Sequence, residues 1–239
     1  MAAVTANVST HLAGFVTSIA TAVVIVALAI VPFLTPAWVS FEQGRTGALE
    51  LTGFTVAELR TATDAILADL VFGPPDFDVQ VAGQPVLDER ERAHMRDVRG
   101  VFAGFGLVAL IAGAGLVVSV LAARRLGHAD RAWAAIRNGA RGLAVGVVVA
   151  GVIVLFAFDA VFEIFHRLLF PSGSYTFDSG TERLVQLFPF DFWAETTMAV
   201  GGVILVACVL VSLIAGRLAA RMPAPQPEGH AATSPVGAR

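Results

Sequence analysis

Three ionisable side chains stand at the end of an otherwise apolar stretch in the second half of the chain. Asp159, Glu163 and His166 occur within the segment FDAVFEIFHRLLFP, residues 158–171. Side chains at these spacings form one stripe along a helix. Ionisable residues at the end of a membrane-spanning segment are costly and usually face a protein interior or a wet cavity, so the stripe is a candidate functional site. The alternative is that all three side chains simply reach headgroups and water.

A second histidine lies upstream, in a charged segment. Residues 88–102 read DERERAHMRDVRGVF and run without a helix breaker into another apolar stretch. On a helix Glu91, His94 and Val98 share one face, and Asp97 is close enough to orient the His94 imidazole. Histidine titrates near pH 6.5, so two histidines facing one cleft can pass protons near neutral pH. The alternative for this segment is a solvated helix with surface ion pairs.

The two histidines also fit a metal-site pattern. Glu91-x-x-His94 and Glu163-x-x-His166 repeat a motif of di-metal carboxylate sites in helix bundles. Such a site needs a carboxylate from each of two further helices, and the other apolar runs offer none within them. A di-metal oxidoreductase therefore stays an alternative, while we expect neither a metal nor another cofactor. A transporter is disfavoured, because the other runs carry no charge in their middle.

The composition places the chain in a membrane. Of its 239 residues 56% are hydrophobic and 15% charged, with a mean hydropathy of +0.75, which is too apolar for an ordinary soluble domain. All 16 basic residues are arginine and the net charge is -3, so no basic stripe for nucleic acid is present. Membrane lipid is the expected surrounding, and nucleic acid is excluded as a partner.

Four apolar runs are long enough to cross the hydrocarbon core, which takes about 20 residues. They predict an all-α membrane protein with four transmembrane helices, at residues 12–34, 101–123, 143–165 and 197–215. Residues 1–221 would form one integral membrane domain. Residues 222–239, rich in Pro, Ala, Gly and Ser, are expected to be a disordered tail.

The arginines predict the orientation of the helices. The connection between the second and third runs, residues 124–142, carries five arginines against Asp130 alone, which marks it as cytoplasmic. Arg217 and Arg221, after the fourth run, agree. We therefore expect a multi-pass membrane protein with both termini in the cytoplasm.

The segment between the first two runs, residues 35–99, would then form a small mixed α/β extracytoplasmic cap. Thr55 and Glu58 predict a capping box and a short helix to about Leu70. Residues 49–54, 77–81 and 86–87 are predicted to be short strands, the last two joined through residues 82–85.

Helix lengths predict that the histidines share one depth. At 1.5 Å per residue, His94 lies about 45 Å along its helix from Arg124, and His166 about 38 Å from Arg141. Both would reach the outer headgroup zone. Because a short loop joins the two helices, we expect them to be antiparallel neighbours with both histidines in one interfacial cleft.

Three segments resemble the bacterial lipoprotein intramolecular transacylase (Lit) family. They are Glu91-x-x-His94-Met95-x-Asp97-Val98, Asp159-x-x-Phe162-x-x-Phe165-His166, and Tyr175-x-Phe177-Asp178 followed by Leu184, Phe188-Pro189 and Phe192. Two positions depart from the family pattern, which has tryptophan in place of Tyr175 and aspartate in place of Glu182.

The resemblance implies an enzyme that moves an acyl chain within a diacylglyceryl-modified lipoprotein. The chain would pass from glycerol to the amine of the N-terminal cysteine and give a lyso-form lipoprotein, with no metal and no external donor. His94 and His166 would be the catalytic pair, acting at the extracytoplasmic face of a bacterial cytoplasmic membrane. The candidate supporting or substrate-binding residues are Glu91, Asp97, Asp159, Glu163, Arg167 and Asp178. Besides the di-metal oxidoreductase, a non-enzymatic membrane binding protein remains an alternative.

Overall fold

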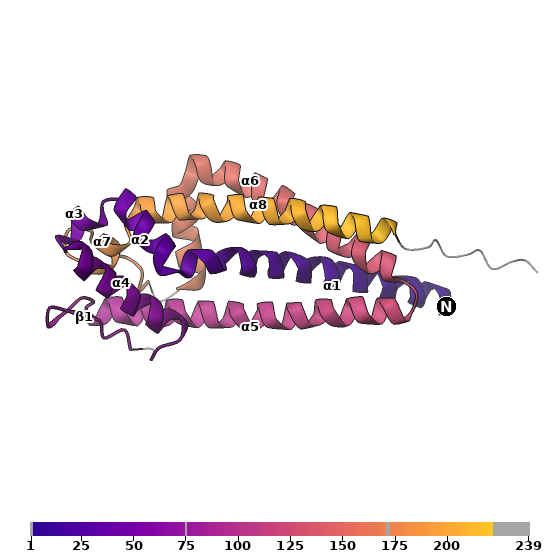
Figure 1. Ribbon diagram of the computed structural model, residues 1–239, viewed down its shortest axis with the longest axis horizontal. Helices are drawn as coiled ribbons and strands as arrows, with labels where there is room; N and C mark the ends of the chain where they lie inside the picture. Colours follow the sequence, from indigo (N-terminus) through magenta and orange to yellow (C-terminus); the bar gives the residue numbers. More distant parts are fainter. Residues whose placement is uncertain (1, 75, 171–172, 222–239) are drawn as a thin grey trace, which may run out of the picture.

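The computed structural model describes residues 2–74, 76–170 and 173–221 as a long helical bundle with a small cap at one end (Figure 1). The predicted tail, residues 222–239, lies outside the described residues. In chain order the elements are α1 (Ala2–Ile30), η1 (Val31–Leu34), α2 (Pro36–Arg45), α3 (Ala48–Thr52), α4 (Val56–Val71), β1 (Gln80–Val81), β2 (Gln84–Pro85), α5 (Glu89–Arg125), α6 (Ala129–Leu169), α7 (Arg183–Leu187) and α8 (Phe190–Ala220).

Four helices, α1, α5, α6 and α8, are long and apolar enough to cross a membrane, as predicted. Helix α5 has 37 residues, about 55 Å, which exceeds the roughly 30 Å hydrocarbon core. Its first turns therefore extend into the cap. They begin at a capping box in which Asp88 accepts from the Glu91 amide and Glu91 accepts from the Asp88 amide.

Helix α1 lies between α5 and α8 in the bundle (Figure 1), and α6 packs mainly against α8 and α1. Helix α6 approaches α1 closely, because a Cβ added at Gly139 would lie 2.3 Å from the Ser18 carbonyl oxygen. The Ser18 hydroxyl also donates to the Ala135 carbonyl at 2.9 Å. The expectation that α5 and α6 are close antiparallel neighbours is therefore wrong over most of their length, because α1 takes the place beside each of them.

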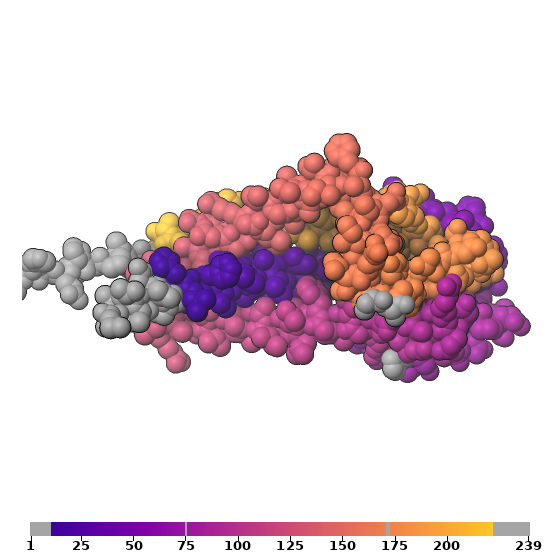
Figure 2. All heavy atoms as spheres, turned by 180° about the vertical axis from the view of Figure 1, so that it is seen from behind, coloured from indigo at the N-terminus to yellow at the C-terminus, as the bar shows by residue number. Residues whose placement is uncertain are grey.

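Helix α6 bends sharply at Ala157, whose φ of -146° and ψ of 38° are not helical. Beyond the bend its last turns cross the bundle and reach the side of α5 (Figures 1 and 2). The straight helix assumed for the depth of His166 is thus wrong. Neither proline nor glycine lies beside Ala157, so packing rather than local sequence places the bend. Phe158 and Phe162 beyond it pack on Phe190 of α8, with ring centroids 5.0 and 6.1 Å away.

The cap is built from α2, α3, α4, a β-hairpin and α7 around its own apolar core. A buried amide joins three of these helices: Gln43 of α2 donates to the Leu187 carbonyl at 2.9 Å and accepts from the Thr63 hydroxyl at 3.0 Å. The helix starting at Val56 begins at the predicted capping box of Thr55 and Glu58. A satisfied polar bridge of this kind fixes how the helices sit against one another.

The strand predictions in the cap need correction. Residues 49–54 contain the helix α3 and not a strand, because glycines with φ of 76° and 67° at Gly47 and Gly53 start and stop a single helical turn. The hairpin exists, but its strands are Gln80–Val81 and Gln84–Pro85, so the predicted strand at residues 86–87 is wrong and the predicted strand at 77–81 is shorter. Its pairs are Gln80 with Pro85 and Val81 with Gln84, and residues 82–83 form the turn.

Candidate active site

His94 and His166 meet at the cap end of the bundle. Their imidazole rings are roughly parallel, with centroids 6.2 Å apart and planes inclined by 24°. His94 comes from the cap-side turns of α5, and His166 comes from the part of α6 beyond the bend. The bend therefore brings together two residues on helices that α1 otherwise separates.

Aromatic side chains enclose His94, which is 6% exposed. Phe170 and Phe177 contact its ring edge-on, with centroids 4.8 and 5.4 Å away. The Nδ1 atom of His94 is buried and has no hydrogen-bond partner within the described part of the chain. A buried imidazole nitrogen without a partner is costly, so it is available to a ligand.

The surroundings keep His94 neutral. The residue lies in the cap, seven positions before the apolar run that begins at Val101. Burial and the nearby His166 imidazole lower the pKa of His94 to about 4, against an opposing effect of the Asp97 carboxylate. Since the protonated form is lost above that pH, His94 is neutral near pH 7.

A hydrogen bond within α6 fixes the tautomer of His166. Its Nδ1 lies 2.8 Å from the Phe162 carbonyl oxygen, four residues earlier. A carbonyl oxygen only accepts, so Nδ1 carries the hydrogen and Nε2 of the neutral ring presents a lone pair. This nitrogen has the electronic form that a general base needs.

The other members of the α6 stripe are exposed. Glu163 accepts a hydrogen bond from the Tyr175 hydroxyl at 3.1 Å and lies 3.8 Å from the Arg167 guanidinium. The Tyr175 ring also lies over His166, at 5.2 Å between centroids. Asp159, exposed, stands two residues beyond the bend. Glu163 and Arg167 thus belong to the rim around His166, while Asp159 lies nearer the bend.

The remaining predicted carboxylates hold the segment 173–189, which we call the outer loop. Asp97 accepts from the Ser174 hydroxyl at 3.3 Å. Asp178 closes a turn, accepting from the Gly180 amide at 2.8 Å. Glu91, only 2% exposed, accepts from the Leu184 amide at 2.6 Å and so ties α5 to α7.

Sequence reasoning missed a contact that closes the outer loop over His94. The Arg90 guanidinium pairs with Glu182 and lies 5.0 Å from the centroid of the Phe177 ring, which in turn touches His94. Phe177 and Glu182 appear only among the positions of the resemblance. Their pairing with Arg90 carries no local signal, because the partners are far apart in the sequence.

Comparisons with known proteins agree with this architecture. The family profile described as lipoprotein intramolecular transacylase Lit matches residues 13–193, which is more than half of the chain. The chain belongs to the Lit family. It is therefore a membrane-integral acyltransferase, rather than a di-metal oxidoreductase or a non-enzymatic binding protein. A comparison with curated protein sequences finds no match.

Solved structures of Lit from Bacillus cereus share the fold. One is 18% identical, covers 90% of this chain and 97% of its own, and superposes with a TM-score of 0.76. Two variants of the same protein, with one histidine replaced by arginine or by alanine, are 20% and 19% identical with TM-scores of 0.72 and 0.74. The first variant covers 89% of this chain and 92% of its own, and the second covers 91% and 97%.

The repeated Glu-x-x-His pattern does not assemble a ligand cluster. Within residues 2–74, 76–170 and 173–221, no three His, Cys, Asp or Glu side chains gather closely enough to hold a metal ion. Glu91 accepts from the backbone amides of Asp88 and Leu184, and Glu163 accepts from the Tyr175 hydroxyl. The histidines meet each other while the two carboxylates turn to other partners.

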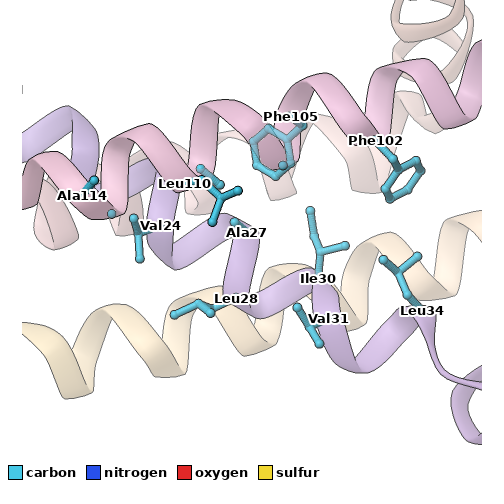
Figure 3. Close-up of a pocket in the computed structure, with 13 residues that line it drawn as sticks. Val24, Ala27, Leu28, Ile30, Val31, Leu34, Phe102, Phe105, Leu110 and Ala114 are labelled. Carbon is cyan, nitrogen blue, oxygen red and sulfur yellow. The ribbon is translucent and has the colours of Figure 1, made fainter. Parts of the chain in front are cut away.

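An apolar groove of about 550 Å³ lies between α1 and α5. Phe102 and Phe105 of α5 project from the face that also carries His94, toward Ile30 and Leu34 (Figure 3). Phe102 stands about 12 Å along α5 from His94. The lining residues are all apolar: Val24, Ala27, Leu28, Ile30, Val31, Leu34, Phe102, Phe105, Gly106, Ala109, Leu110, Gly113 and Ala114.

Proposed function

We propose that the protein moves one acyl chain within a diacylglyceryl-modified lipoprotein, from a glycerol oxygen to the α-amine of the N-terminal cysteine. The observation that carries this proposal is the pair of stacked histidines, His94 and His166, at the cap end of the bundle. The carbon–nitrogen bond forms as the ester carbon–oxygen bond breaks. Product and substrate are therefore isomers, and no second substrate is required.

The reaction needs two proton movements that the histidine pair can supply. An α-amine has a pKa of about 7.7 to 8.0 and must lose a proton to attack, whereas the departing glyceryl oxygen must gain one. Because His166 Nδ1 donates its hydrogen to the Phe162 carbonyl, Nε2 carries a free lone pair. This nitrogen accepts the proton of the amine. Neutral His94 lies opposite and donates its N–H proton to the departing glyceryl oxygen, and the proton held on His166 then restores neutral His94. These roles are proposals for His94 and His166.

The predicted supporting residues are assigned by their contacts. Glu91, Asp97 and Asp178 act as positioning residues, because they bind α7 or the outer loop. Glu163 and Arg167 lie on the rim beside His166 and are candidates to meet the polar head of the substrate. Asp159 is proposed to contact substrate only at the edge of the site, because it lies nearest the bend.

The groove between α1 and α5 is proposed to receive an acyl chain. Its lining is apolar and begins on the face of α5 that carries His94. The surrounding lipid tails are as apolar as the groove, so moving an acyl chain into the groove adds little affinity. The groove instead aligns the acyl chain so that its ester lies at the histidine pair.

We further propose that the cap is extracytoplasmic and both termini are cytoplasmic. The support is the arginine-rich connection between α5 and α6, at the opposite end of the bundle from the cap (Figure 1). Diacylglyceryl-lipoproteins in the outer face of a bacterial membrane would then lie at the same depth as the histidine pair.

The test is co-expression with a model diacylglyceryl-lipoprotein in a host that lacks other N-acylation. Because the product is an isomer, the intact mass should stay constant while tandem mass spectrometry finds one acyl chain on the cysteine nitrogen and one on glycerol. Lipoprotein that keeps both chains on glycerol, in cells whose membranes contain the protein, would overturn the proposal. The same host without the protein is the control.

A further inference from the structure

The end of the bundle away from the cap carries arginines in excess of acidic groups. Residues 124–142 hold five arginines against Asp130, and α8 ends with Arg217 followed by Arg221. The ion pairs within the described residues all lie at the cap end. This end of the protein therefore presents cations that the described chain does not neutralise.

Two nitrogen donors at this end are buried and unsatisfied. Neither Trp133 Nε1 nor Arg137 Nε has a hydrogen-bond partner within the described part of the chain. The two residues are one helical turn apart on α6, so their side chains are neighbours on one face. A buried donor without an acceptor costs free energy, and more when the donor is charged. An acceptor from outside the chain would therefore stabilise both donors.

That face of α6 lies against both α1 and α8. Ala140, one turn further along the stripe, packs in a core with Ile25 and Ala29 of α1 and with Ile204 and Cys208 of α8. At Gly216 of α8, an added Cβ would lie 3.6 Å from Arg137 Cδ. The Arg137 side chain thus passes α8 at Gly216, where α8 has no side chain, so the start of α6 meets the end of α8 at this point.

We propose that Trp133 and Arg137 bind the phosphate of an anionic phospholipid headgroup where the start of α6 meets the end of α8. A guanidinium binds phosphate oxygens with paired, charge-assisted hydrogen bonds, and an indole N–H adds a further donor at the depth where tryptophan prefers to lie. The exposed Arg217, beside Gly216, increases the positive potential there. This site is separate from the histidine pair and does not depend on the acyl-transfer reaction.

The test is native mass spectrometry of the full-length protein, released from detergent with added phosphatidylglycerol or phosphatidylcholine. Wild type should retain one phosphatidylglycerol in preference to phosphatidylcholine. R137Q and W133F should weaken that retention, R137Q by about tenfold or more, because a charged hydrogen bond to phosphate is lost. R131Q is the matched control, since it removes the same charge from an exposed position of α6 and should leave retention unchanged.

A second arm separates lipid from free anion. Inorganic phosphate in millimolar excess should fail to displace the retained lipid; displacement would assign the site to free phosphate and overturn the lipid proposal. Equal retention by wild type, W133F and R137Q, or an equal loss in R131Q, would also overturn it and leave the arginines as a diffuse charged surface. If R137Q does not fold, thermal unfolding of wild type and W133F decides the question. Phosphatidylglycerol should raise the unfolding temperature of wild type but not that of W133F.

Discussion

The His94 and His166 rings stack at 6.2 Å because α6 bends at Ala157. A straight α6 would continue along α8 and carry His166 away from α5. The bend instead directs the last three helical turns across the bundle. Phe162 holds His166 through a hydrogen bond to its carbonyl and through its ring, whose centroid lies 4.1 Å from that of the imidazole. The geometry of the site thus depends on a backbone feature nine residues from the histidine.

The groove makes a steric prediction. Ala109→Trp places a large ring among the lining residues of α5 and should lower the acyl-transfer rate about tenfold or more, because misalignment of an ester by an ångström is enough for such a loss. Ile111→Trp, on the exposed side of the same helix, is the control and should keep the wild-type rate. Rates are measured with a diacylglyceryl lipopeptide in detergent. Equal rates for both variants would remove the groove from the reaction.

The close approach of α6 to α1 makes a stability prediction. Gly139→Ala forces its methyl group against the Ser18 backbone and should lower the free energy of unfolding by about 1–3 kcal/mol. The methyl group of Gly142→Ala meets no atom of the described residues within 4 Å and, as a helix substitution, should be neutral or stabilising by up to about 1 kcal/mol. Thermal unfolding in one detergent compares the pair. A Gly139→Ala protein as stable as wild type would show that the helices separate more easily than their packing implies.

The orientation is tested with reporter fusions. Fusions after Gly127 should report a cytoplasmic location, and a fusion after Gly83, in the hairpin of the cap, should be exported. A fusion after Met222 should also report a cytoplasmic location. A cytoplasmic reporter at Gly83 would place the histidine pair on the wrong side for exported lipoproteins.

Metal analysis tests the alternative reading of the Glu-x-x-His repeat. We expect substoichiometric iron, manganese and zinc in purified protein, and a rate that chelators do not change. Glu91→Gln should still lower thermal stability, because the carboxylate that holds the Leu184 amide becomes a weaker acceptor. Two tightly held metal ions per chain that disappear in Glu91→Ala or Glu163→Ala would favour the di-metal site instead.

Local patterns were enough to predict the spans, the long α5 and the capping box at Thr55. Hydropathy and capping act within one or two helical turns, so neighbouring residues carry the full signal. Equal depth on adjacent helices also predicts the meeting of His94 and His166. The structure reaches the same result through the bend at Ala157.

The features that sequence reasoning could not supply are set by contacts between distant segments. The bend follows from the packing of Phe158 and Phe162 on Phe190, and no local residue marks it. The strand predicted at residues 49–54 failed because apolar alternation is ambiguous over so few residues, and the flanking glycines decide for a helical turn. The contact of Arg90 with Phe177 joins α5 to the outer loop and leaves no trace in either segment alone.

The paired histidines are tested most directly by the acyl-transfer rates of His94→Ala, His166→Ala and the double variant, measured on one diacylglyceryl lipopeptide. Each single variant should lose about 100- to 10,000-fold, the usual range for general acid–base help, and the double variant should be little worse than either, because cooperating groups are not additive. Exposed His11 and His128, at the other end of the bundle, serve as controls and should leave the rate intact. A loss below about tenfold in single variants that still fold and insert would contradict a catalytic role for the pair.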